Sequence, residues 1–171
     1  MTTKMMTSTT QHLIDLMERE HATTLKVLRA YPADQAHIRP HSKCKTALEL
    51  AWVFVIEQGL AQTLLTTGID FTKPMPAWPE PPATLAAVIG ALEQAHAKTM
   101  TLVRALTQDG LHETVKFFVA PKTLGDVPKL DFLEFMTHDQ IHHRGQLSIY
   151  LRMADGKVPS IYGPSADEPF F

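Results

Sequence analysis

The chain has 171 residues, of which 44% are hydrophobic and 20% are charged, a balance typical of a globular domain with one core. Its formal net charge of -2 supplies no positive field for nucleic acid or for an anionic membrane surface. Cys44 is the only cysteine, so an intrachain disulfide is excluded and a reducing cytoplasm is the expected compartment. We expect residues 1–171 to form a single cytoplasmic domain that binds neither nucleic acid nor membrane.

Two amphipathic helices are predicted in the first part of the chain, because apolar residues there recur at three- and four-residue steps. The first covers residues 11–30. The second covers residues 46–67 and ends at Gly68, since glycine favours the left-handed conformation that closes many helices. The apolar stretch 47–65 within it contains Glu57 and other polar residues, so it is too polar for a membrane span and too long for a strand.

Two further helices are predicted at residues 85–106 and 130–154, after a rigid, proline-rich connector at residues 70–82. The run 114–119, Thr-Val-Lys-Phe-Phe-Val, has the composition of a strand but no evident partner. We therefore interpret residues 108–128 as an extended crossover. Four helices with long crossover connections after the second and the third predict an all-α fold, an irregular four-helix bundle.

The last helix carries a cluster of polar side chains with the spacing of a metal site. His138 and His142 are four residues apart, and so are Asp139 and His143. Two groups four residues apart lie on one face of a helix and can bind one metal ion. A helical projection puts Asp139 and His143 near the middle of the apolar sector, with His142 and His138 toward one flank.

Glu57 lies on the apolar stripe of the second helix, where a carboxylate is unexpected. Burying a charged group without a partner costs several kcal/mol, so Glu57 needs either a metal ion or a polar neighbour. It could instead extend its carboxylate past the end of the bundle, or pair with His142 or with Arg144, which the projection puts on the polar side of the last helix. Asp139 and His143 could likewise form a hydrogen-bonded pair without a metal.

A metal site would draw its ligands from the second and the last predicted helices. Either pair on the last helix, 138 with 142 or 139 with 143, could complete it. The candidate metal ligands are Glu57, His138, Asp139, His142 and His143.

Three segments of the chain resemble a known family. Residues 142–152, His-His-Arg-Gly-Gln-Leu-Ser-Ile-Tyr-Leu-Arg, closely resemble the signature of the DinB-like (YfiT-like, damage-inducible) family. Residues 158–165 and residues 46–52, at the start of the second helix, are similar to it as well. The resemblance spans nearly the whole chain. It implies a four-helix bundle, often a homodimer, with a divalent metal ion, zinc or nickel, in a pocket of the bundle.

The resemblance also implies a ligand set. The family's usual ligands are one histidine on the second helix and two groups four residues apart on the last helix, which match Asp139 and His143 here. The second-helix position is occupied by Val53, which cannot bind a metal. Glu57, one turn later, could replace the missing histidine about 6 Å further along the helix. That displacement would also favour His138 and His142 as the pair of ligands on the last helix.

The function implied by the resemblance is that of a metal-dependent enzyme, a thiol-dependent transferase or a hydrolase-like protein acting on a small molecule. The metal would lower the pKa of a bound thiol or water. We expect a pocket lined by Trp52, Phe54, Phe135 and Tyr150. Valine at position 53 favours an alternative, a non-catalytic stress-response dimer that binds a metal or a small ligand. DNA binding, suggested by the family's historical name, is disfavoured because the chain has no basic stripe.

Overall fold

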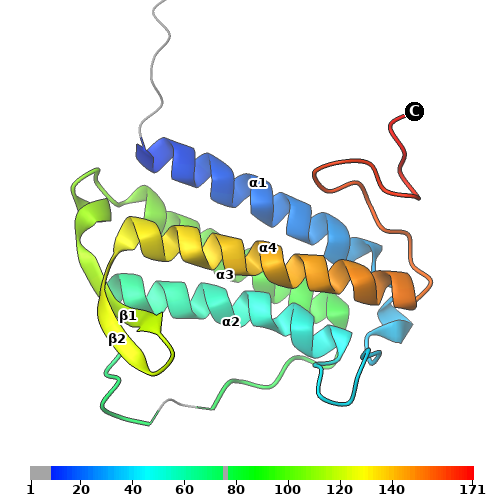
Figure 1. Cartoon of the computed structure of the whole chain (residues 1–171), viewed down its shortest axis with the longest axis horizontal. Coiled ribbons are helices and arrows are strands. Elements are labelled where there is room, and N and C mark those ends of the chain that lie inside the picture. The colour runs from blue at the N-terminus through cyan, green and yellow to red at the C-terminus, as the bar shows by residue number, and fades with distance from the viewer. Residues whose placement is uncertain (1–8, 75–76) are drawn as a thin grey trace, which may run out of the picture.

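The computed structural model describes residues 9–74 and 77–171. Four helices lie side by side along the long axis of the molecule (Figure 1): α1 (Thr9–Ala30), α2 (Ala47–Thr66), α3 (Leu85–Arg104) and α4 (Lys129–Met153). Each predicted helix is present, and its ends lie within two residues of the expected ones. The expected four-helix bundle is thereby confirmed. One short 3₁₀ turn, Ala33–Gln35, lies between α1 and α2, and another, Gly110–His112, follows α3.

Local hydrogen bonds explain why the central helices begin and end where they do. Thr46 caps α2: its hydroxyl accepts a hydrogen bond from the backbone N–H of Glu49 at 3.2 Å, and the Glu49 carboxylate accepts one from the N–H of Thr46 at 2.6 Å. This reciprocal pair satisfies two N–H groups that the helix leaves free. Thr84 caps α3 through the N–H of Ala87. Gly68 follows α2 with a φ of 70°, as expected for a helix-terminating glycine.

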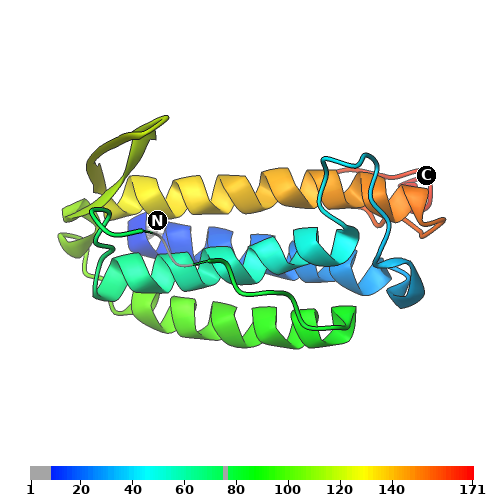
Figure 2. The ribbon, with the colours of Figure 1, turned by 90° about the horizontal axis from the view of Figure 1, so that it is seen from below.

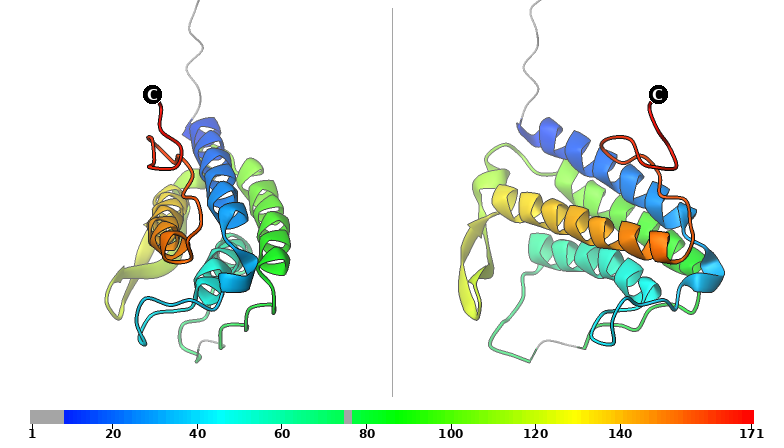
Figure 3. Two further views of the ribbon diagram at one scale, coloured as in Figure 1. Left: turned by 90° about the vertical axis from the view of Figure 1, so that its right-hand side faces the viewer. Right: turned by 45° about the vertical axis from the view of Figure 1, so that its right-hand side comes forward.

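The helices form a bundle in which α4 packs between α1 and α2, and α3 packs between the same two helices on the other side. The chain runs in one direction along α1 and α4 and in the opposite direction along α2 and α3 (Figures 1 and 3). Since α2 and α3 point the same way, the connection between them returns along the bundle. It crosses the outer face of α2 (Figure 2). The expected crossover after the second helix is therefore present.

The connection between α3 and α4 differs from the expected crossover. It forms an antiparallel hairpin of β1 (Thr114–Ala120) and β2 (Thr123–Pro128), with Val115 opposite Val127. Because α3 and α4 run in opposite directions, this connection stays at one end of the bundle (Figure 1). The partner strand escaped the sequence analysis because Gly125, Asp126 and Pro128 belong to residue types that are depleted in strands.

The helix α2 is apolar nearly all round. Contrary to the expectation from the sequence that this stretch is too polar, its length and composition alone would allow it to cross a membrane, a test that the core helix of a globular protein also passes. Its polar residues Glu57 and Gln58 are both buried inside the bundle. Two sides of α2 pack against α3 and α4, whereas the side that carries Trp52, Ile56 and Leu60 is only partly buried.

The buried face of α4 is rotated away from the expected one. Phe135 and Ile149, which set the expected apolar sector, are 50% and 61% exposed. Arg144, expected on the polar side, is only 1% exposed. The projection failed because it assigned large apolar residues to the interior and arginine to the surface. As a consequence, Asp139 and His143 lie at the edge of the buried face, next to α2, and not at its middle.

Candidate metal centre

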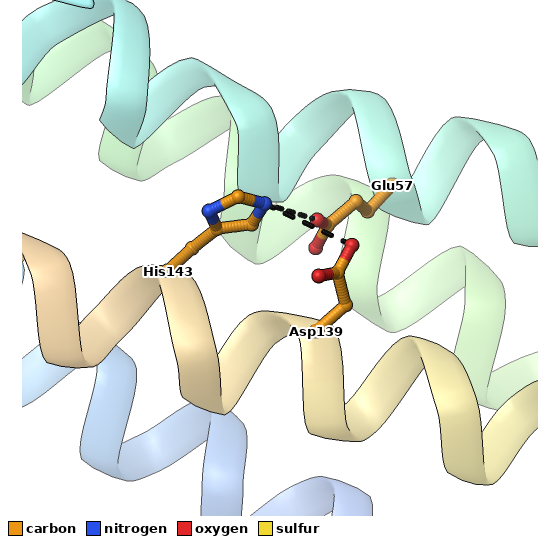
Figure 4. Close-up of side chains that lie close together, drawn as sticks. All are labelled: Glu57, Asp139 and His143. Carbon is orange, nitrogen blue, oxygen red and sulfur yellow. Dashed lines mark ion pairs between the residues drawn. The ribbon is translucent and has the colours of Figure 1, made fainter. Parts of the chain in front are cut away.

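Three side chains converge where α2 faces α4. Glu57 comes from α2, and Asp139 and His143 come from successive turns of α4 (Figure 4). The Nε2 atom of His143 lies 3.4 Å from Oε1 of Glu57 and 3.8 Å from Oδ2 of Asp139. One ligand atom from each residue lies within 4.8 Å of the other two. Two carboxylate oxygens and one imidazole nitrogen form a donor set that suits divalent transition metals and leaves coordination positions open.

The environment of Glu57 is what distinguishes this cluster from an ordinary surface group. Its side chain is buried, with a residue exposure of 5%, yet neither carboxylate oxygen accepts a well-formed hydrogen bond from the described residues; the side chains of Asp139 and Gln140 are its polar neighbours. Burial, together with the nearby carboxylate of Asp139, raises the pKa of Glu57 to about 9. A buried carboxylate without a donor is costly, and a divalent cation between Glu57, Asp139 and His143 would remove that cost. The residues present therefore fit a metal ion.

The imidazole of His143 is held by a neighbour on its own helix. Its Nδ1 atom lies 3.1 Å from Oε1 of Gln146, whose Nε2 atom lies 2.9 Å from Nε2 of His142. When Nδ1–H donates to Gln146, Nε2 carries no proton and its lone pair faces the two carboxylates. The ring of Phe54 meets that of His143 edge to face, with centroids 6.5 Å apart. Gln146 was missed by the sequence analysis, although its i+3 spacing from His143 is visible there.

The other two candidate ligands lie apart from this cluster. His138 and His142 are exposed on α4, and neither joins Glu57 in the cluster of possible ligand atoms. The structure thus brings together the second of the two i,i+4 pairs considered from the sequence, Asp139 with His143. The expectation that a ligand at position 57 would favour His138 and His142 is therefore wrong, because Glu57 lies beside Asp139 and His143.

The centre opens into a cavity of about 730 Å³ between α2, α4 and the loop that precedes α2. Trp52 and Phe135 line this cavity, as does Val53, the position at which the resemblance implies a histidine. Phe54 is fully buried beneath His143. Tyr150 is buried in the core, where its hydroxyl donates a hydrogen bond to the carbonyl of Lys45 at 3.1 Å, and it does not line the cavity.

A second buried polar cluster was missed by the sequence analysis. The guanidinium of Arg144 donates to the Glu20 carboxylate at 2.8 Å and to the Glu20 carbonyl at 3.1 Å. The Tyr162 hydroxyl donates to the same carboxylate at 2.6 Å. Arg144 therefore faces α1 and the C-terminal segment and does not contact Glu57. Both Arg144 and Tyr162 belong to the segments that resemble the family, so part of that resemblance reflects a structural cluster and not the metal centre.

Comparison with known proteins agrees with the fold and with the sequence resemblance. Residues 5–169 match the sequence profile of the DinB family. The chain belongs to the DinB family. It is 29% identical over 167 residues to the uncharacterized protein YrdA of Bacillus subtilis, which covers 95% of this chain and 93% of YrdA.

Two solved structures of DinB-like proteins are similar to this DinB-family chain. One, from Bacillus cereus, superposes with a TM-score of 0.71 at 21% identity over 88% of this chain and 95% of that one. The other, from Bacillus subtilis, has a TM-score of 0.65 at 17% identity over 86% of this chain and 96% of that one. At these identities the likeness concerns the fold alone.

Proposed function

We propose that this DinB-family protein binds a divalent metal ion, zinc or nickel, through Glu57, Asp139 and His143. One observation carries the proposal: Glu57 is a buried carboxyl group without a well-formed hydrogen bond to the described residues, beside a second carboxylate and an imidazole. Imidazole nitrogen suits zinc and nickel, and carboxylate oxygen also binds zinc. Glu57 takes the place of the histidine that is absent at position 53, because it reaches Asp139 and His143 on α4 from the next turn of α2.

We further propose that the ion serves a reaction on a small molecule, of the thiol-dependent transferase or hydrolase-like class. When bound, the ion would act as a Lewis acid that lowers the pKa of a thiol or water. Three protein ligands leave positions free on the side of the cavity. The chain's own residues prepare the centre: Gln146 orients the His143 ring, and Val53 lines the cavity with an apolar surface beside Glu57.

A non-catalytic metal- or ligand-binding role is the second candidate, and valine at position 53 favours it because that position contributes no ligand. We also propose a cytoplasmic homodimer. Ile149 and Met153, two of the large apolar side chains that the bundle leaves exposed on α4, support association between copies. Sedimentation of the purified protein at several concentrations tests the dimer directly.

The metal proposal is tested by titrating zinc and nickel into the untagged, metal-free protein by calorimetry. We expect one ion per chain in the wild-type protein. Glu57→Gln and His143→Ala should each weaken binding by at least about tenfold, the loss expected for a missing ligand or ligand partner. His138→Ala is the matched control on the same helix and should bind as the wild type does. No binding by the wild-type protein, or equal losses in all three variants, would contradict the proposal.

A further inference from the structure

The outer face of α2 is apolar but has no helix packed against it. Val55 and Gly59 lie on this face between the partly exposed side chains of Trp52, Ile56 and Leu60. The connection between α2 and α3 passes over it (Figure 2). Between the two lies a groove of about 590 Å³. That volume lies in the range of pockets that enclose small organic ligands. Ligand pockets are typically concave and mostly apolar, as this groove is.

The groove adjoins the cavity of the candidate metal centre. Trp52, Ile56 and Leu60 follow one another at i, i+4 and i+8, so they form a ridge along α2. This ridge borders both spaces. Val55 and Gly59 lie on the groove side of the ridge, and Val53 and Glu57 on the side of the metal centre. A single molecule that lies across the ridge would therefore touch both.

The far wall of the groove is fixed by a hydrogen bond. The indole Nε1 of Trp52 donates to the carbonyl of Pro79 at 2.6 Å, which ties the connection to α2. Trp78 beside it is 60% exposed and borders both spaces. The charged residues of the groove, Asp70 and Lys73, pair with each other at 3.2 Å. The groove therefore offers mainly apolar and aromatic contacts, with little to bind a charged group.

We propose that the groove binds the aromatic or branched apolar body of a small molecule whose polar, metal-binding end lies at Glu57, Asp139 and His143. This inference rests on the proposed function, because it names the class of substrate for that same centre. The enclosing walls favour a small molecule over a second copy of the chain, which would need a larger and flatter surface.

Gly59 allows the groove to be filled without disturbing the core. A Cβ atom at this position would meet nothing within 4 Å, and replacing glycine inside a helix favours the helix. Gly59→Phe should therefore fold and occupy the groove. Gly59→Ala leaves most of the space free. Gly90→Phe on α3 is the matched control, since its Cβ is equally free and it lies outside the groove.

The two tryptophans of the chain provide the readout, because Trp52 and Trp78 both border the groove. The first experiment titrates the neutral apolar dye N-phenyl-1-naphthylamine into metal-free protein and follows energy transfer from tryptophan. We expect saturable binding of one dye per chain in the wild type, in Gly59→Ala and in Gly90→Phe. Gly59→Phe should weaken it by about tenfold or more. Equal affinity in Gly59→Phe and wild type would overturn the proposal.

A second outcome would overturn it in favour of a different occupant. If the wild-type dimer binds no dye and Gly59→Phe turns it into a monomer in sedimentation, a second copy of the chain covers the groove. Because the dye experiment uses metal-free protein, it decides the groove even if the metal titration fails. Failure of the metal titration alone would instead refute the proposed function.

A second experiment tests whether one ligand reaches both the groove and the metal centre. In zinc-loaded protein, 2-naphthohydroxamic acid, which can bind a metal, is compared with 2-naphthamide, which lacks that group. We expect the hydroxamate to bind at least about tenfold more tightly, with the advantage lost when zinc is removed. Gly59→Phe should weaken both compounds. An equal affinity of the two compounds for zinc-loaded protein would overturn the claim that the groove and the centre share a ligand.

Discussion

The Oε1 atom of Glu57 lies 3.4 Å from Nε2 of His143 without forming a hydrogen bond. The two residues come from different helices, α2 and α4, and Asp139 completes the group one turn before His143. In the metal-free protein this arrangement holds two carboxyl groups close together in a partly dry environment, which favours the protonated form of Glu57. Its effect on the free energy of unfolding and its effect on metal binding can both be measured.

The stability of the metal-free protein should depend on the proton of Glu57. The pKa of this residue is about 9 in the folded protein against an ordinary value of 4.5. The folded state therefore retains a proton that the unfolded state has released, so the free energy of unfolding falls as pH rises through this window. We expect a slope of up to about 1.4 kcal/mol per pH unit in urea unfolding. Glu57→Gln should remove it, whereas Glu134→Gln, on the exposed side of α4, should keep it.

The same proton should couple metal binding to pH. A metal ion binds the carboxylate and not the acid, so Glu57 must release its proton when the ion binds. We expect the apparent affinity for zinc to rise by as much as about tenfold per pH unit between roughly pH 6 and pH 8. Calorimetry in two buffers of different ionisation enthalpy should detect the released proton. An affinity that is constant across this range would show that Glu57 is not a ligand.

Gln146 should affect the metal without touching it. Its amide oxygen holds Nδ1 of His143 at 3.1 Å, and loss of such an orienting partner typically costs about 10- to 100-fold in metal affinity. We expect Gln146→Ala to weaken zinc binding by about tenfold while leaving urea unfolding of the metal-free protein almost unchanged, since Gln146 is exposed. Unaltered zinc affinity in this variant would mean that the His143 ring needs no support.

The cluster around Arg144 should matter for stability. Arg144→Met leaves the buried carboxylate of Glu20 with only the exposed Arg19, 3.7 Å away, as a cationic partner, and loss of a buried partner typically costs about 3–5 kcal/mol. Tyr162→Phe removes two hydrogen bonds, the one that the hydroxyl donates to Glu20 and the one that it accepts from Arg144, and should cost about 2 kcal/mol. Lys26→Met breaks the exposed pair with Glu168 and should cost at most about 1 kcal/mol. If Arg144→Met unfolds in urea no more easily than Lys26→Met, the buried pair is not a stabilising element.

Acid should weaken the contact between α1 and α3. The rings of His21 and His96 stack with centroids 3.7 Å apart. Burial, together with the charge of His96, lowers the pKa of His21 to about 4 from 6.5. The unfolded state binds this proton more readily, so stability is complete above about pH 6.5 and is lost as pH falls toward 4. His21→Phe keeps a stacked ring and should flatten that loss in urea unfolding. An unchanged acid profile would assign the loss to other groups.

Helix positions could be predicted from the sequence because their signals are local. Spacing of apolar residues, the cap at Thr46 and the stop at Gly68 each act within one or two turns. The i,i+4 pair of Asp139 and His143 is local for the same reason. Glu57 was found because a carboxylate on an apolar stripe needs an explanation wherever its partner lies.

Features that depend on two distant segments could not be predicted in this way. The β2 strand forms because β1 lies beside it, despite a composition that disfavours strands. The buried face of α4 differs from the expected one because Arg144 pairs with Glu20 on α1. The spacing of residues within α4 does not reveal this pairing. Phe135 likewise contacts the hairpin and not the helical core: its ring centroid lies 5.7 Å from that of Phe117.

The connection between the parallel helices α2 and α3 is longer than the distance that it must span. A helix the length of α2 spans about 30 Å, which an extended chain covers in about nine residues. The connection at 67–84 has about twice that number, so it can bow outward without straining either helix. Surface connections tolerate insertions and deletions well, because loop length changes closure entropy only slowly. Shortening this one by a few residues would draw it toward Ile56 and narrow the groove, while the core and the candidate metal ligands stay in place. The volume of the groove can thus change by trimming or extending one surface segment.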